Sequence, residues 1–164
     1  MIERNPVVVT SPGDRDIVVK RDFNAPRDLV FAAYTQPELL RRWFGPHGYT
    51  LAECAIDLRV GGHWRYLVRG DDGSEMVLQG YFREVEPPAL LVTTEVFGEE
   101  YIVDVESIAS ARFDESDGRT TLTITVRYPT GATRDQMALS GMAEGMGQGY
   151  ERLDDLLAQL SDGD

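Results

Sequence analysis

The amino-acid sequence predicts an α+β domain with a curved sheet of seven antiparallel strands, two short helices between the first two strands, and a long C-terminal helix. Two observations support this prediction. Between residues 49 and 128, runs of alternating apolar and polar residues are separated by turn-forming residues, which is typical of half-buried antiparallel strands. From residue 133 to residue 160, apolar residues recur every three or four positions, which is typical of an amphipathic helix.

The first strand is expected at residues 17–23, and the two short helices follow it. Pro26 suits the first turn of a helix that reaches Tyr34. Thr35 and Glu38 form a capping-box pattern for a second helix, which Gly45 and the proline after it bring to an end. The other six strands are expected at residues 49–60, 63–69, 75–85, 90–97, 102–113 and 121–128.

Residues 56–66 are the most informative segment, because alternation continues on both sides of a Gly-Gly pair. We expect a strand that bends sharply at these glycines, and a second irregularity, a bulge, at Gly80. By parity, Trp64 and Tyr66 then share the concave face of the sheet. Their two rings either line a ligand-binding cup or fill a core.

The C-terminal helix is expected to start near a second capping box, Thr133 with Gln136, and to run unbroken to Leu160. Each glycine inside a helix costs about 1 kcal/mol relative to alanine. The glycines either allow another backbone to approach closely or leave empty volume beneath the helix, and neighbouring methionines favour the second explanation. A bent helix packed tightly on the sheet is the alternative. The glycines are Gly141, Gly145, Gly147 and Gly149, and the methionines are Met137, Met142 and Met146.

Composition narrows the function classes. The chain has 164 residues, a formal net charge of -12 and a pI of about 4.5, which argues against nucleic-acid or anionic-membrane partners. No transmembrane run or signal peptide is recognisable, so we expect a cytoplasmic protein. Residues 1–14 are expected to form a flexible lead-in, residues 15–160 one domain, and residues 161–164 a flexible tail.

Little in the sequence indicates catalysis, a metal site or a cofactor. Cys54 shares the parity of the apolar residues after it and is expected to be a small buried residue. His47 lies in a Gly-Pro loop, either at the mouth of a cavity or in solvent, and His63 has the outward parity. Arg65 and Glu95 are either polar groups of a cavity or exposed strand residues. No histidine–carboxylate spacing typical of a metal site occurs.

Several motifs together resemble a known family. They are Ala25-Pro26 followed by Val30-Phe31, the sequence TQPELLRRWF at 35–44, DLRVGGHWRY at 57–66, Gly80-Tyr81 through Glu86-Pro87-Pro88, LLVTT at 90–94, and GMGQGY at 145–150 followed by Arg152-Leu153. The chain resembles the START-like, Bet v 1-like (SRPBCC) superfamily. Within it, the chain is similar to bacterial homologues of the C-terminal domain of the heat shock protein 90 ATPase activator. The resemblance covers residues 16–160.

The resemblance implies a helix-grip fold, in which the sheet wraps around the C-terminal helix and leaves an internal cavity. It also implies a small apolar or aromatic ligand, because relatives bind or transform such molecules. The activator holds the chaperone with a separate N-terminal domain to which nothing in this chain corresponds, so a protein partner is not indicated. The predicted wall residues are Trp43, Phe44, Trp64, Tyr66, Tyr81, Phe97, Met142, Met146 and Tyr150.

Three hypotheses follow for the function. The first is a non-enzymatic binding module for a small hydrophobic ligand, without catalytic residues, cofactor or metal. The second is an enzyme of the polyketide cyclase or hydratase type, in which tyrosine hydroxyls, Arg65 or Glu95 polarise a carbonyl or move a proton; a buried carboxylate with a raised pKa would favour it. The third is a chaperone-associated protein-binding module, which an exposed apolar patch would favour.

Overall fold

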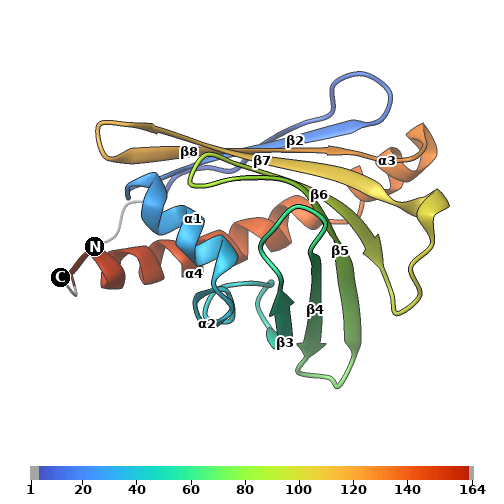
Figure 1. The fold of residues 1–164 in the computed structure, drawn as a ribbon, viewed down its shortest axis with the longest axis horizontal. Helices are drawn as coiled ribbons and strands as arrows, with labels where there is room; N and C mark the ends of the chain where they lie inside the picture. Colours follow the sequence, from blue (N-terminus) through green and yellow to red (C-terminus); the bar gives the residue numbers. More distant parts are fainter. Residues whose placement is uncertain (1–3, 163–164) are drawn as a thin grey trace.

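One antiparallel sheet curls around a long helix, α4, in this computed structural model, which describes residues 4–162 (Figure 1). The strand order is β1-β2-β8-β7-β6-β5-β4-β3. The predicted α+β helix-grip architecture is confirmed, with eight strands instead of seven. The strands are β1 (Val8–Thr10), β2 (Asp16–Phe23), β3 (Tyr49–Ile56), β4 (His63–Gly70), β5 (Glu75–Glu86), β6 (Leu90–Phe97), β7 (Ser107–Ser116) and β8 (Arg119–Arg127).

The additional strand is β1, within the stretch that the sequence assigned to a loose lead-in. It pairs antiparallel with β2, and Val9 lies opposite Val19. Three residues are too few to show an alternating pattern. The order of this segment comes from hydrogen bonding to an existing sheet edge, a tertiary effect that local sequence does not reveal.

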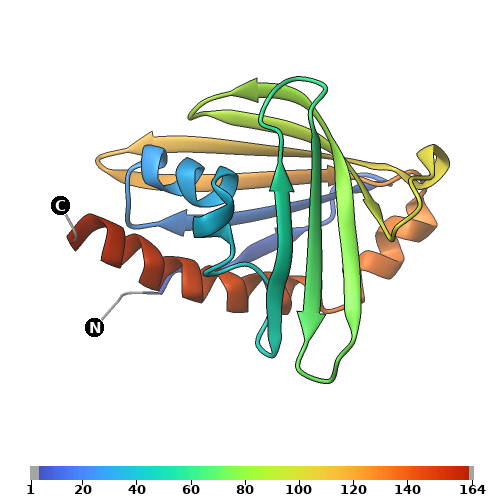
Figure 2. The same cartoon turned by 60° about the horizontal axis from the view of Figure 1, so that its bottom comes forward.

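Four helices lie on the concave side or at the end of the sheet. Helices α1 (Arg27–Thr35) and α2 (Pro37–Leu40) lie beside α4 (Met142–Asp162), while α3 (Gly131–Ala138) lies at the opposite end of the molecule (Figure 2). Thr35 does not cap α2 as predicted. Its hydroxyl donates to the carbonyl of Phe31 at 2.8 Å, inside α1.

The Gly-Gly segment is a hairpin loop and not a bend within a strand. β3 ends at Ile56, which pairs with Trp64 of β4, and residues 57–62 connect the two strands. Gly61 has a φ of +83°, a conformation that glycine adopts without steric penalty, and it reverses the chain. Leu58 and Val60, which have the same parity as Trp64 in the sequence, lie in this loop and are exposed.

Two further strand details differ from the prediction. β7 begins at Ser107, because Val103–Val105 form a short 3-10 helix where a strand was expected. The irregularity in β5 lies between Phe82 and Glu84 and not at Gly80. A side chain at Gly80 would instead collide with the carbonyl oxygen of Thr94, only 1.8 Å from its Cβ position.

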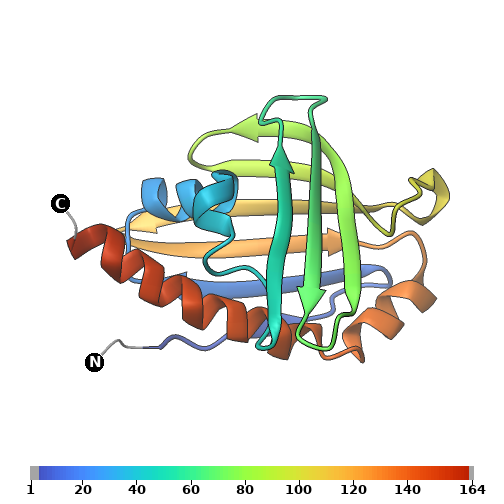
Figure 3. The ribbon, with the colours of Figure 1, turned by 90° about the horizontal axis from the view of Figure 1, so that it is seen from below.

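The C-terminal helical region is broken, which corrects the prediction of one helix (Figure 3). Gly141 has a φ of +80° and lies between α3 and α4, where it lets the chain change direction. The cap of α3 is also earlier than predicted. The Thr130 hydroxyl accepts from the backbone N–H of Thr133 at 3.1 Å.

Within α4, Gly149 allows a close approach of another backbone, so the empty-volume explanation is wrong for this glycine, whereas Gly145 and Gly147 meet side chains at ordinary contact distances. A Cβ at Gly149 would lie 3.3 Å from the carbonyl oxygen of Gly45, and one at Gly145 would lie 3.5 Å from Pro46. The Arg152 guanidinium donates to the carbonyls of the same two loop residues. Glycines and Arg152 together fasten the loop after α2 to α4.

Part of the core lies where α1, β2 and α4 meet. Phe23 packs edge-on against Tyr150 with 5.3 Å between ring centroids. In this region Arg21 and Asp154 form a buried ion pair, with 2.7 Å between Nη2 and Oδ2. Apolar packing and a paired charge therefore both join α4 to the first strands of the sheet.

Candidate functional site

The concave face carries three of the predicted wall residues as ordinary core. Trp43, Trp64 and Tyr150 are at most 4% exposed. The Trp43 indole N–H donates to the carbonyl of Ala33 at 3.0 Å, and the Tyr150 hydroxyl accepts from that of Tyr34 at 2.8 Å. Trp43 and Tyr150 therefore have their hydrogen bonds satisfied within the protein and stabilise it.

Four other predicted wall residues pack against the core but stay partly exposed. Phe44 and Tyr66 meet edge-on, with 5.2 Å between ring centroids. The four residues are Phe44, Tyr66, Met142 and Met146.

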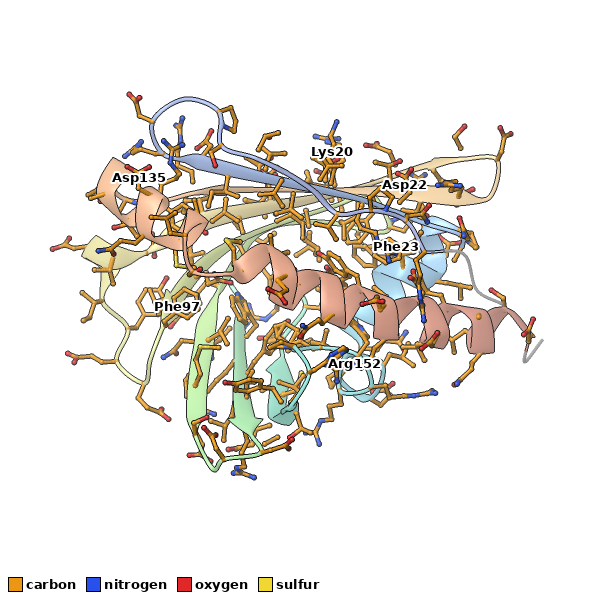
Figure 4. All side chains as sticks on the ribbon, turned by 180° about the vertical axis from the view of Figure 1, so that it is seen from behind. Lys20, Asp22, Phe23, Phe97, Asp135 and Arg152 are labelled. Carbon is orange, nitrogen blue, oxygen red and sulfur yellow. The ribbon has the colours of Figure 1, made fainter. Side chains whose placement is uncertain are left out.

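The last two predicted wall residues do not join this group. Tyr81 is 42% exposed on the outer face, where its ring centroid lies 5.0 Å from that of His63. Its parity is opposite to that of Trp64, because His63 pairs with Tyr81. Phe97 has the inward parity of Leu78 but lies at the end of β6, toward α3, and is 46% exposed (Figure 4).

Glu95 is an acidic residue on the concave face of the sheet. It shares parity with Phe97 on β6 and lies opposite Ser107 of β7. Burial alone raises the pKa of its carboxyl from 4.5 to about 7. The position of Glu95 two residues before the predicted wall residue Phe97 was a signal for this placement.

Two tyrosine hydroxyls lie close enough to Glu95 for its charge to affect them. Burial, followed by the charges of Cys54 and Glu95, raises the pKa of Tyr66 well above its usual range. Burial and then Glu95 raise the pKa of Tyr128 to about 12. Tyr128 was missed as a site residue, although it continues the inward parity of β8.

The two remaining polar candidates lie away from this group. Arg65 is on the outer face and pairs with Glu99 at 2.8 Å. Of its two predicted positions, the one in a cavity is therefore wrong. His47 is exposed, and its backbone N–H donates to the Gln148 side chain at 2.8 Å. Neither side chain is placed to contact a molecule beside Tyr66.

Cysteine chemistry and metal binding have little support. Burial raises the pKa of the half-buried Cys54 thiol, which leaves it in the poorly nucleophilic thiol form. Within residues 4–162, no group of three or more His, Cys, Asp or Glu side chains could hold a metal ion. No helix in this part of the chain is long and apolar enough to cross a membrane.

Two open grooves lie at the surface. One, of about 470 Å³, adjoins the end of β6 and is bordered by Met76 and Phe97. The other, of about 390 Å³, separates the N-terminal segment from α4 and is lined by Arg4, Arg21 and His47 among others. Only the first groove reaches a predicted wall residue, Phe97.

Comparison with known proteins identifies relatives over most of the chain. The family described as "Activator of Hsp90 ATPase homolog 1-like protein" matches residues 24–158. No functionally curated protein matches the chain.

Solved structures from several bacteria have the same fold. A protein from Rhodobacter sphaeroides is 30% identical, with a TM-score of 0.86 over 93% of this chain and 99% of that one. A protein from Nitrosomonas europaea is 26% identical, with a TM-score of 0.82 over 92% and 98% of the two chains. One from Mycobacterium smegmatis is 25% identical, with a TM-score of 0.83 over 93% and 97%.

Proposed function

The chain belongs to the family of activator of Hsp90 ATPase homolog 1-like proteins, and on that premise we propose that it binds a small apolar or aromatic molecule between the sheet and α4. One observation carries the proposal. Phe44, Tyr66, Met142 and Met146 pack against the core but remain partly exposed. Aromatic and thioether side chains with a few polar groups are the usual lining of small-molecule sites.

The chemistry of these residues suits a ring-sized ligand. Aromatic faces of Phe44 and Tyr66 provide flat apolar contact area, and the flexible side chains of Met142 and Met146 adjust to the shape of a guest. Phe97 has the inward parity of Leu78, which pairs with Tyr66, but it borders a separate surface groove together with Met76. The resulting surface favours an aromatic molecule over a sugar or a nucleotide.

The test is a thermal-shift titration with neutral naphthalene derivatives, read together with intrinsic tryptophan fluorescence. A bound ligand at one hundred times its dissociation constant adds about 2.7 kcal/mol to the free energy of unfolding. We expect a dose-dependent rise in Tm that Tyr66→Ala abolishes. Tyr81→Ala is the matched control, because Tyr81 is on the neighbouring strand but faces outward.

Absence of a shift with every derivative, or equal loss in Tyr66→Ala and Tyr81→Ala, contradicts the proposal. That result would favour a protein-binding module that uses the outer face, where Tyr81, Ile102 and Val105 are exposed. These residues are the surface that a protein-binding module would use.

A second candidate function is supported by Glu95. A carboxyl whose pKa is about 7 can both give and take a proton at neutral pH, as a cyclase or hydratase requires. Any compound that the titration identifies is therefore incubated with the protein and analysed for turnover. Loss of turnover in Glu95→Gln, with ligand binding retained, would assign the reaction to this carboxyl.

A further inference from the structure

The Glu95 side chain extends from β6 between two small neighbours. Ser107 lies opposite it on β7, and the register of β5 places Gly80 on its other side. Neither neighbour is large enough to cover a glutamate side chain. Within residues 4–162, no hydrogen bond or ion pair engages the Glu95 carboxyl, so its oxygens have bonding capacity left over.

Three hydrogen-bond donors near this carboxyl also lack a strong acceptor among the described residues: the Trp64 indole N–H and the hydroxyls of Tyr66 and Tyr128. The Trp64 indole N–H is buried and unpaired, and its nitrogen lies 2.8 Å from the position of a Cβ at Gly80. The Tyr128 hydroxyl meets only the Met142 sulfur, at 4.0 Å. Buried polar groups in proteins are usually hydrogen-bonded, so these donors and the Glu95 carboxyl have the capacity to bind a polar atom of a ligand.

The charges around Glu95 determine which class of ligand can bind there. The titratable groups facing Glu95 are the hydroxyls of Tyr66 from β4 and Tyr128 after β8, while β5 and β7 contribute Gly80 and Ser107. None of these is a cation, and the net charge of the chain is -12. A carboxylate or phosphate would be desolvated here without a counter-charge, at a large free-energy cost.

We propose that Glu95, together with Tyr66 and Tyr128, recognises an uncharged carbonyl or hydroxyl oxygen on an otherwise apolar ligand and rejects anionic ligands. This inference rests on the proposed function and names the ligand class for the same site. A neutral carboxyl and two hydroxyls donate hydrogen bonds to a carbonyl oxygen. Ionisation of Glu95 removes its donor and places a negative charge beside that oxygen.

The experiment compares three naphthalenes of the same ring size: the methyl ketone 2-acetylnaphthalene, its apolar analogue 2-ethylnaphthalene, and the anion 2-naphthoate. Dissociation constants are measured by tryptophan fluorescence on the intact chain at about pH 6 and about pH 8.5. We expect the ketone to bind about tenfold more tightly than the ethyl compound at the lower pH. The preference shrinks at the higher pH, and the anion binds most weakly at both.

Two substitutions separate hydrogen bonding from shape. Glu95→Gln keeps a donor without a titrating group, so the preference for the ketone persists and loses its pH dependence. Glu95→Leu removes the donor, so the ketone and the ethyl compound bind equally. Glu99→Gln is the matched control on the outside of the same hairpin and leaves the preference and its pH dependence unchanged, because Glu99 pairs with Arg65.

The outcomes distinguish this inference from the proposed function. Equal binding of the three naphthalenes, or tightest binding of 2-naphthoate, overturns the inference and leaves the proposed function standing. A ketone preference that survives in Glu95→Leu also overturns it. Binding of none of the three at either pH removes the proposed function and this inference with it.

Discussion

The two halves of α4 contact the sheet in different ways. In the C-terminal half, Leu153 is fully buried and Asp154 forms a buried ion pair with Arg21. In the N-terminal half, Met142 and Met146 are only partly buried, and the Met142 sulfur lies 4.0 Å from the Tyr128 hydroxyl. The helix is therefore buried against the sheet in its C-terminal half and only partly covered in its N-terminal half.

The largest expected effect comes from breaking the ion pair in the closed half. Asp154→Ala leaves the Arg21 guanidinium buried without its carboxylate, and we expect a loss of about 3–5 kcal/mol in the free energy of unfolding. Urea denaturation followed by circular dichroism measures it. Asp155→Ala is the control, because Asp155 is exposed and pairs with Arg4 at the surface, which predicts a change of about 0–1 kcal/mol. Equal effects of the two substitutions would show that the pair does not fasten α4.

The second prediction compares apolar truncations in the two halves directly. Leu153→Ala removes a fully buried side chain and is expected to cost about 2–5 kcal/mol. Met142→Ala, in the partly exposed half, is expected to cost about 1 kcal/mol or less. The same denaturation experiment measures both. A cost at Met142 as large as that at Leu153 would mean that the N-terminal half is packed as tightly as the C-terminal half.

The third prediction concerns how the stability of the folded chain depends on pH through Glu95. The folded chain holds the Glu95 proton up to about pH 7, whereas the unfolded chain releases it near pH 4.5. The contribution of this group to stability is therefore greatest below about pH 4.5 and falls as pH rises through about 7. The Glu95→Gln variant does not lose this stability as the pH rises. At pH 8 we expect its free energy of unfolding to be about 2–3 kcal/mol higher than that of the unsubstituted chain.

Thermal and urea denaturation between about pH 4 and pH 8 measure the difference in the free energy of unfolding between Glu95→Gln and the unsubstituted chain. We expect this difference to vanish near pH 4. Glu99→Gln provides the control, because the Glu99 side chain is 74% exposed. A constant difference between Glu95→Gln and the unsubstituted chain across the pH range would show that the Glu95 pKa is not raised by folding.

Much of the candidate site followed from parity. Alternation correctly placed Trp64 and Tyr66 inward and His63 outward, because successive strand residues point to opposite faces. The same rule applied to β6 puts Glu95 beside Phe97, although an exposed position was favoured for Glu95 from the sequence. Tyr81 was predicted as a wall residue after a bulge at Gly80, but β5 is regular there and the structure places Tyr81 outside.

The sequence by itself determined the helix-grip fold, seven of the eight strands and the chain's family, because alternation, turn residues and family motifs are local signals. Only the tertiary structure decided which aromatic residues are buried and which remain partly open. It also decided that Gly141 ends a helix and that Gly149 admits the loop backbone beside Gly45. These outcomes depend on how distant segments approach each other, and periodicity within one segment carries no information about that distance.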